Sequence, residues 1–119
     1  MRYLCGMVRE LVLYKDYFAE FYAQLPLPVQ DKFDYVLALV RSEARVPEKF
    51  LKHLTGTDGL YEIRVKSEGN IYRVFCFFDA GRLVILLSGF HKKTDKTPAA
   101  KLRRAALLKA EYFKKSKPA

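Results

Sequence analysis

Cysteine and tryptophan are scarce in this chain of 119 residues, which has two cysteines, Cys5 and Cys76, and no tryptophan. Two cysteines provide neither a disulfide framework nor the repeated spacing of a metal site. We therefore expect reduced thiols, with Cys76 buried on the inward face of a strand, and no metal and no cofactor. Glycine-rich phosphate loops, H-E-x-x-H and G-x-S-x-G are also missing, which excludes the enzyme classes that depend on them.

Long apolar runs are missing as well. No segment approaches the roughly 18 apolar residues of a membrane-spanning helix. The first residues lack the basic, apolar and small-residue pattern of a signal peptide. These absences predict a cytoplasmic protein with no membrane partner. Half of the residues are hydrophobic and 14% are aromatic, so we expect one folded domain over residues 1–119.

Negative charge is rare toward the C-terminus. The chain has 22 basic and 13 acidic residues and a formal net charge of +9. From Lys92 onward there are ten basic and only two acidic residues, a net +8 for this segment. Such a field favours polyanions, of which nucleic acid is the commonest. A solvated, lysine-rich helix is the alternative interpretation of the last lysines.

Three predicted strands follow one another in the second half of the chain. Residues 60–66 alternate between apolar and charged side chains, and residues 71–78 and 83–90 are rich in β-branched and aromatic side chains. Their connections are short, which predicts an antiparallel meander. Pairing residue 66 with residue 71 places Arg64 directly opposite Arg73. Like charges in such positions destabilise a sheet, so the pair indicates a place where an anion binds.

The same register gathers charged residues on one side of the predicted sheet, the arginine face. With Asp79 opposite Arg82, Arg73 faces Ser88, and His91 points to the other side. The expected members of the arginine face are Glu62, Arg64, Lys66, Arg73, Ser88 and Lys92, with Lys93 at its rim. A solvated face with incidental charges is the alternative. Replacing Arg73 by alanine is expected to relieve a like-charge contact and to stabilise the protein slightly.

The other segments are predicted to be mainly helical. We expect a first strand at residues 7–14, a helix capped by Asp16, a longer helix after Pro28, a short helical turn that starts at Pro47, and a last helix that starts at Thr97-Pro98 and ends near Lys115. The two early helices should cover the apolar side of the sheet. The result is an α+β fold: an antiparallel meander with N-terminal helices on one face and a basic C-terminal helix.

Several short motifs from residue 50 onward carry a resemblance to a known family through their order and spacing. They are Leu54-Thr55-Gly56, the stretch 59–64 (GLYEIR), Tyr72-Arg73-Val74, the stretch 86–94 (LLSGFHKKT), Lys96-Thr97-Pro98 and a basic helix that ends in Glu111-Tyr112. The chain resembles the RelE/ParE superfamily of toxins, most of all its HigB-type or phage-derived branch. The N-terminal half agrees only in its pattern of a strand and two helices.

The resemblance implies a toxin of a bacterial toxin–antitoxin pair with a RelE-like fold. Many such toxins cleave messenger RNA in the ribosomal A site without a metal. The expected partners are therefore the ribosome, mRNA and a cognate antitoxin, a helix-turn-helix protein encoded nearby. Two alternatives remain open. A gyrase-inhibiting toxin shares the fold without cutting RNA, and a plain nucleic-acid-binding domain uses the basic helix and performs no chemistry.

The resemblance also suggests roles for individual residues. It implies that Arg64 and Arg73 handle the scissile phosphate, with Lys92 or Lys93 as the basic position after the last strand. Candidates for the general base are Glu62, His91 or a lysine, although Glu62 could equally pair with a neighbouring cation and His91 could be a surface histidine. The C-terminal helix has no candidate for a catalytic tyrosine apart from Tyr112. The expected RNA-binding residues are Lys52, Lys66, Lys93, Lys101, Arg103 and Arg104, with a solvated helix face as the alternative for Lys52. Phe75 and Phe77 either stack on a base or fill a second core under the last helix.

Overall fold

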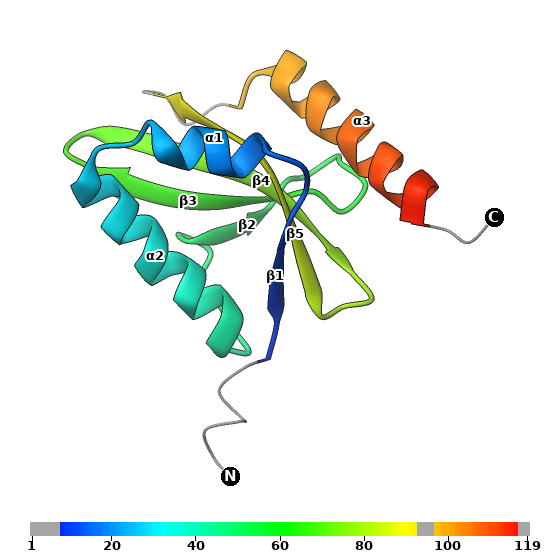
Figure 1. Cartoon of the computed structure of the whole chain (residues 1–119), viewed down its shortest axis with the longest axis horizontal. Helices are drawn as coiled ribbons and strands as arrows, with labels where there is room; N and C mark the ends of the chain where they lie inside the picture. The colour runs from blue at the N-terminus through cyan, green and yellow to red at the C-terminus, as the bar shows by residue number, and fades with distance from the viewer. Residues whose placement is uncertain (1–7, 93–96, 117–119) are drawn as a thin grey trace, which may run out of the picture.

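The computed structural model of the protein describes residues 8–92 and 97–116. After a first short strand come two helices, four successive strands and a last helix (Figure 1). They are β1 (Glu10–Leu13), α1 (Tyr17–Ala23), α2 (Leu27–Ser42), β2 (Leu51–His53), β3 (Tyr61–Ser67), β4 (Asn70–Asp79), β5 (Leu83–Lys92) and α3 (Ala99–Ser116). This order confirms the predicted α+β class.

The strands form a five-stranded sheet in the order β1-β5-β4-β3-β2. The central strands β3, β4 and β5 pair antiparallel, which confirms the predicted meander. β2 adds to one edge by antiparallel pairing with β3, and β1 adds to the other edge by parallel pairing with β5. The β1–β5 register ends at Leu86, so the last residues of β5 have β4 as their neighbour on one side only.

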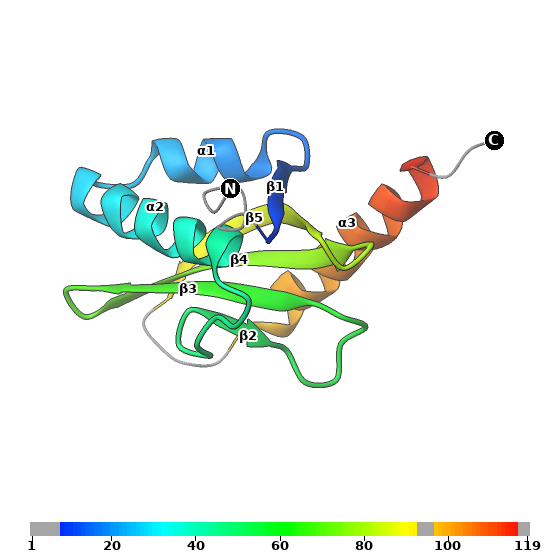
Figure 2. The same cartoon turned by 90° about the horizontal axis from the view of Figure 1, so that it is seen from below.

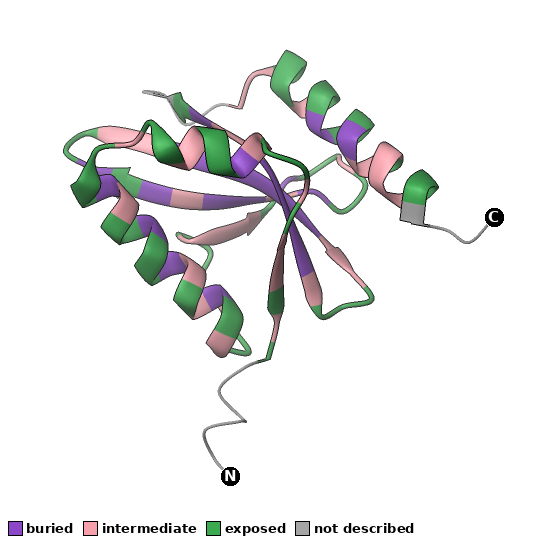
Figure 3. Cartoon of the chain, in the orientation of Figure 1, coloured by how far each residue is buried: buried purple, intermediate pink, exposed green. Residues whose placement is uncertain are grey.

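Two hydrophobic cores lie on opposite faces of this sheet. α1 and α2 bury Phe18, Val29 and Phe33 against one face, where Ile63 and Cys76 lie. Figure 2 shows both helices on that side of the sheet. The second core lies under α3, and Figure 3 shows the buried residues concentrated in the central strands and on the sheet-facing sides of the helices. These cores confirm the predicted helical cover of the apolar face and the burial of the Cys76 thiol.

Phe75 and Phe77 belong to the second core, as one of the two interpretations of these residues predicts. Both rings are buried under α3, where Ala105 and Leu108 are buried with them. The Phe77 ring lies 5.4 Å from the ring of Phe113, measured between centroids. Aromatic packing therefore fixes α3 to the same face of the sheet that holds the charged residues.

The predicted partner of Arg73 is wrong. Arg73 lies opposite Phe90, whereas Ser88 has no direct opposite residue in the ladder. Two local features shift the register. The turn between β4 and β5 has one residue more than expected, with Ala80 and Gly81 at positive φ, and an irregularity between Val74 and Cys76 adds a second offset.

The predicted helical turn after Pro47 is only partly correct. The backbone does turn there, because the N–H groups of Phe50 and Leu51 both donate to the Pro47 carbonyl. Residues Leu51–His53 then form strand β2 rather than a helix, since they pair with β3. Sequence periodicity could not reveal a strand of three residues whose partner lies ten residues further along the chain.

Two element boundaries and one helix cap also differ from prediction. The first strand covers only Glu10–Leu13, and Met7 lies outside the described residues. Asp16 occupies the position before α1, but its side chain makes no capping hydrogen bond. α3 begins at Ala99, and the Thr97 hydroxyl is used elsewhere, as described below. Among the described helices, none is long and apolar enough to cross a bilayer.

Candidate functional site: a basic cleft over a buried ion pair

A cleft of about 520 Å³ opens on the arginine face between the β2 end of the sheet and the start of α3. β2 and the loop that follows it form one wall, β3 and β4 form the floor, and the residue before Pro98 closes one end. The lining residues are Lys52, Leu54, Thr55, Glu62, Arg64, Lys66, Arg73 and Thr97. Four of these eight residues are cations and one is an anion, so the cleft carries net positive charge.

A buried ion pair forms the floor of the cleft. Arg73 is 2% exposed and Glu62 is fully buried. The Arg73 Nη1 atom donates to Glu62 Oε1 at 2.8 Å. The Thr97 hydroxyl donates to the other carboxylate oxygen at 2.5 Å and accepts a hydrogen bond from Arg73 Nη1 at 3.3 Å. This network joins β3, β4 and the chain leading into α3 at one point.

The Glu62 carboxylate is the anion that the paired arginines require. Arg64 and Arg73 do lie directly opposite each other, as predicted. Glu62 Oε1 lies 2.8 Å from Arg73 Nη1 and 3.8 Å from Arg64 Nε, so one oxygen serves both guanidinium groups. The sheet therefore tolerates the opposed arginines because a neighbouring carboxylate neutralises part of their charge. This arrangement agrees with the pairing alternative for Glu62.

Arg64, Lys52 and Lys66 lie between this floor and the solvent. The Arg64 side chain is 16% exposed, and Lys66 is exposed at the end of β3. Lys52 lies directly opposite Glu62 in the β2–β3 pairing, so it shares the arginine face. Strand β2 therefore places Lys52 at the cleft. Leu54 and Thr55 also line the cleft, and only the Leu54-Thr55-Gly56 motif pointed to them.

The last residues of β5 approach the same region through their register. Lys92 pairs with Ile71, which precedes Arg73 by two residues on β4 and so shares its face. Lys93 lies outside the described residues. His91 is on the other side of the sheet, as predicted, where its ring stacks on Tyr72 at 4.7 Å between centroids. The structure thus separates His91 from the cleft.

The expected RNA-binding cations of α3 differ in their surroundings. Lys101 Nζ lies 5.3 Å from the centre of the Phe90 ring, and Arg104 Nη2 donates to the Tyr17 hydroxyl at 3.2 Å. Arg103 is exposed on the outer side of the helix. Lys101 and Arg104 therefore also contribute to holding α3 against its neighbours.

Tyr112 has a structural position in the second core. Its hydroxyl donates to Asp79 Oδ2 at 2.7 Å, and its ring packs edge-on against Phe77. The hydrogen bond to Asp79 and burial together raise the pKa of Tyr112 to about 12. The Cys76 thiol is also protonated at neutral pH, because burial raises its pKa. Neither group lies at the cleft.

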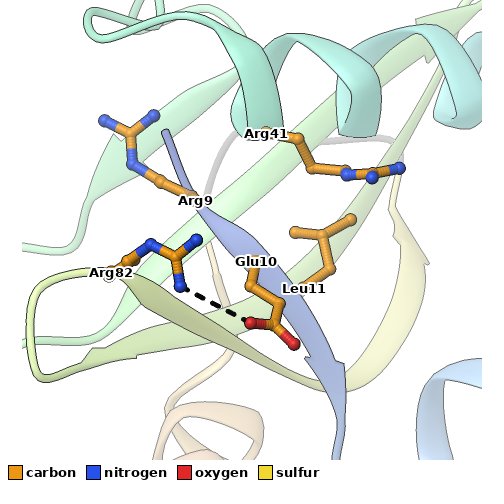
Figure 4. Close-up of a pocket in the computed structure, with 5 residues that line it drawn as sticks. All are labelled: Arg9, Glu10, Leu11, Arg41 and Arg82. Carbon is orange, nitrogen blue, oxygen red and sulfur yellow. Dashed lines mark ion pairs between the residues drawn. The ribbon is translucent and has the colours of Figure 1, made fainter. Parts of the chain in front are cut away.

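A second group of arginines lies at the sheet edge opposite β2, where β1 pairs with the start of β5, and Figure 4 shows its side chains. A pocket of about 370 Å³ is lined by Arg9, Glu10, Leu11, Arg41 and Arg82. The Arg9 guanidinium donates to the carbonyls of Val40, Glu43 and Ala44, and Arg82 forms an exposed ion pair with Glu10 at 3.6 Å. Arg9 therefore caps the C-terminal end of α2. Unlike the cleft, this pocket contains no buried ion pair between the described side chains that line it. Over residues 8–92 and 97–116, no three His, Cys, Asp or Glu side chains are placed to hold a metal ion.

The meander, the helices on both faces and the basic cleft define an α+β protein consistent with the RelE-like fold. Residues 20–109 match the model of the family described as Phage derived protein Gp49-like (DUF891). The chain belongs to this family, which is a family of RelE/HigB-like toxins. No curated protein matches the chain.

Proposed function

We propose that this protein is the toxin of a toxin–antitoxin pair and that it cleaves messenger RNA on the ribosome, which stops translation. Family membership supports the toxin class. The observation that supports RNA cleavage is the cleft itself, where Lys52, Arg64 and Lys66 surround a cavity large enough for a nucleotide phosphate. Guanidinium and ammonium groups converging from neighbouring strands are suited to a phosphodiester.

The proposed reaction is a transfer of the RNA backbone without a metal ion. The ribose 2′-oxygen loses its proton to a base and forms a bond to the adjacent phosphorus. The bond from phosphorus to the 5′-oxygen breaks, and that oxygen takes up a proton. The products are a 2′,3′-cyclic phosphate and a 5′-hydroxyl, so atoms and charge balance. Fixed cations stabilise the charge that develops on the phosphoryl oxygens and account for about 10²–10³-fold per well-placed donor.

Each cleft residue has a distinct role in this proposal. Arg64, which reaches the solvent, contacts the scissile phosphate directly, while Lys52 and Lys66 hold the neighbouring phosphates. Arg73 keeps a second guanidinium at the floor, and Glu62 fixes its position. Because the Glu62 carboxylate is occupied by Arg73 and Thr97, and His91 lies across the sheet, we assign the proton transfer to a lysine, with Lys92 as the candidate.

The proposed antitoxin is the product of a neighbouring gene, with a helix-turn-helix domain and an acidic segment. An acidic segment complements the net charge of +9 and orders as it binds the basic face. Binding at the cleft blocks RNA directly. A complex that persists in about 0.5 M salt indicates that apolar burial adds to the charge pairing, because that ionic strength screens exposed pairs.

Expression of the protein with a translation reporter tests the proposal. We expect rapid translation arrest with cut transcripts for the unaltered chain, and neither effect for Arg64→Ala. Arg82→Ala is the matched control, because Arg82 is an exposed arginine far from the cleft, and it should remain toxic. Intact transcripts with DNA damage contradict the proposal and support gyrase inhibition. Intact transcripts without growth arrest support a binding domain.

A further inference from the structure

Another pocket lies mainly on the other side of the sheet from the arginine face, between the end of α1, the start of β4 and the end of β5. Its volume is about 350 Å³. The pocket is lined by Phe21, Gln24, Leu25, Pro26, Tyr72, Phe90 and His91. Most of this lining is apolar, and Gln24 adds an exposed amide. The proposed cleavage chemistry uses none of these side chains.

The Tyr72–His91 pair gives this pocket a flat, rigid surface. The two rings are nearly parallel, with an interplanar angle of 18° and centroids 4.7 Å apart. Tyr72 is 7% exposed, so its ring belongs to the floor, whereas His91 is exposed. His91 Nε2 also lies within hydrogen-bond distance of Asn70 Oδ1, at 2.9 Å. The imidazole is therefore held on one face and at one edge, and its outer face is accessible.

Gly89 explains how the opposite wall is placed. A Cβ atom at Gly89 would lie 2.5 Å from Cδ2 and 2.6 Å from Cε2 of the Phe21 ring. Only glycine lets this ring rest directly on the backbone of β5. Gly89 belongs to one of the motifs that carried the family resemblance. Its role in the structure is to leave room for the Phe21 ring to pack on β5.

We propose that this pocket binds a nucleobase of single-stranded RNA, stacked on the outer face of His91. This inference rests on the proposed function, because it concerns the same RNA substrate. Every base has a planar face that stacks on aromatic side chains, and single-stranded RNA is read largely in this way. The Gln24 amide can donate to or accept from a base edge.

The position of the pocket fits a nucleotide that flanks the cleavage position. Tyr72 and Arg73 are consecutive residues of β4, so their side chains lie on opposite faces of the sheet. The β1–β5 pairing ends at Leu86, which leaves this end of β5 at an edge of the sheet. An RNA strand that passes around this edge places a phosphate at the cleft and a nearby base against His91.

Binding of 5′-AMP to the purified protein, followed by NMR, tests the inference, with ribose 5-phosphate as the probe that lacks the base. We expect saturable shifts of the Tyr72 and His91 signals with 5′-AMP and none with ribose 5-phosphate. His91→Ala should raise the dissociation constant on the order of 10-fold, because the base then has no imidazole to stack on. Gly89→Ala should weaken binding too, since it displaces the Phe21 ring.

His53→Ala is the matched control, because His53 is the other histidine of the chain and also contacts a tyrosine ring. It should bind 5′-AMP as the unaltered protein does. Equal shifts with ribose 5-phosphate, or no shifts with 5′-AMP, overturn the inference. The experiment needs no ribosome, so its failure leaves the cleavage results untouched, and a protein that binds 5′-AMP but cuts no transcript contradicts only the proposed function.

Discussion

At the scale of single residues, Glu62 determines what Arg73 can do. A fully buried carboxylate and a guanidinium that is 2% exposed share a hydrogen bond of 2.8 Å, and the Thr97 hydroxyl contacts both. Charges that are removed from water this completely are stable only while each keeps its partner. The pair therefore acts as one unit. Its carboxylate also lies near Arg64, and its hydrogen bonds to Thr97 attach the start of α3 to the sheet.

Removing Arg73 should destabilise the protein, because the buried Glu62 carboxylate then loses its hydrogen-bonded counter-charge and, among the residues that the structure describes, keeps only Arg64, at 3.8 Å. We expect Arg73→Ala to lower the free energy of unfolding by about 3–5 kcal/mol. Arg64→Ala, which removes a partly exposed cation at 3.8 Å from the carboxylate, should cost about 0–1 kcal/mol. Urea unfolding followed by circular dichroism measures both. An Arg73→Ala protein as stable as the unaltered chain contradicts this description of the pair.

From the sequence, Arg73→Ala is expected to stabilise the protein slightly. From the structure, the same substitution is expected to destabilise it. The sequence shows Arg64 opposite Arg73, and that register was predicted correctly. Sequence alone does not show that the Glu62 side chain turns toward Arg73, which lies diagonally across the ladder, or that it is sealed from water. Side-chain direction and burial depend on packing of α3 over the sheet, which no local pattern encodes.

At the scale of elements, Arg9 fixes α2 to the edge of the sheet. Its guanidinium contacts the carbonyls of Val40, Glu43 and Ala44 at 2.6–2.9 Å. The backbone N–H of Arg9 also donates to the Arg41 carbonyl at 3.0 Å. The last carbonyls of a helix have no partner within it, and a cation is favourable at that end.

Arg9→Ala should therefore lower the free energy of unfolding by about 1.5–3 kcal/mol, the range for hydrogen bonds to a charged group. Arg82→Ala is the control, because Arg82 lines the same pocket in Figure 4 but makes only an exposed ion pair. It should change stability by less than about 0.5 kcal/mol. Equal effects of the two substitutions rule out the capping role of Arg9.

The end of α3 is attached through ionisable groups. The Tyr14 hydroxyl and Lys15 Nζ both donate to Glu111, and these hydrogen bonds lower the pKa of Glu111 below its ordinary value. A carboxyl whose pKa is lower in the folded state contributes stability above its unfolded pKa of about 4.3 and loses it as the pH falls through the folded value.

Glu111→Gln should consequently lower the melting temperature at pH 7. The two proteins should converge at a pH below the folded-state pKa of Glu111, where the carboxyl of the unaltered chain is protonated. Thermal unfolding at both pH values measures the difference. A deficit that persists unchanged at acidic pH shows that the glutamine disrupts packing rather than removing a charge.

At the scale of the whole molecule, the net charge of +9 should determine how tightly the protein binds the ribosome. Arg103 and Lys114 are exposed on α3, away from the cleft. Replacing both by alanine should weaken ribosome binding and flatten its dependence on salt, by a slope of about 0.7–0.9 for each phosphate that is no longer neutralised. Cleavage by complexes that are already bound should be unaffected. A change in the cleavage rate with an unchanged salt dependence of binding contradicts the assignment of these two residues to ribosome binding alone.

The arrangement of the whole sheet could be predicted only in part. Alternation and short turns identified the meander of β3, β4 and β5, and apolar stripes identified α1 and α2. The parallel pairing of β1 with β5 and the antiparallel pairing of β2 with β3 join segments that are far apart or very short. The cleft depends on β2, since that strand brings Lys52 opposite Glu62. The charged residues of the cleft were therefore predictable from the sequence, but the strand pairing that forms its walls was not.

The most direct test of the central claim is single-turnover cleavage of messenger RNA on programmed ribosomes by the unaltered protein and Arg64→Ala. Arg64 is the cleft cation closest to the buried pair that also reaches the solvent. We predict that Arg64→Ala folds normally, binds ribosomes and cuts at least about 10²-fold more slowly. Cleavage by Arg64→Ala at the unaltered rate would contradict the proposed contact between Arg64 and the scissile phosphate, because Arg64 would then take no part in the reaction.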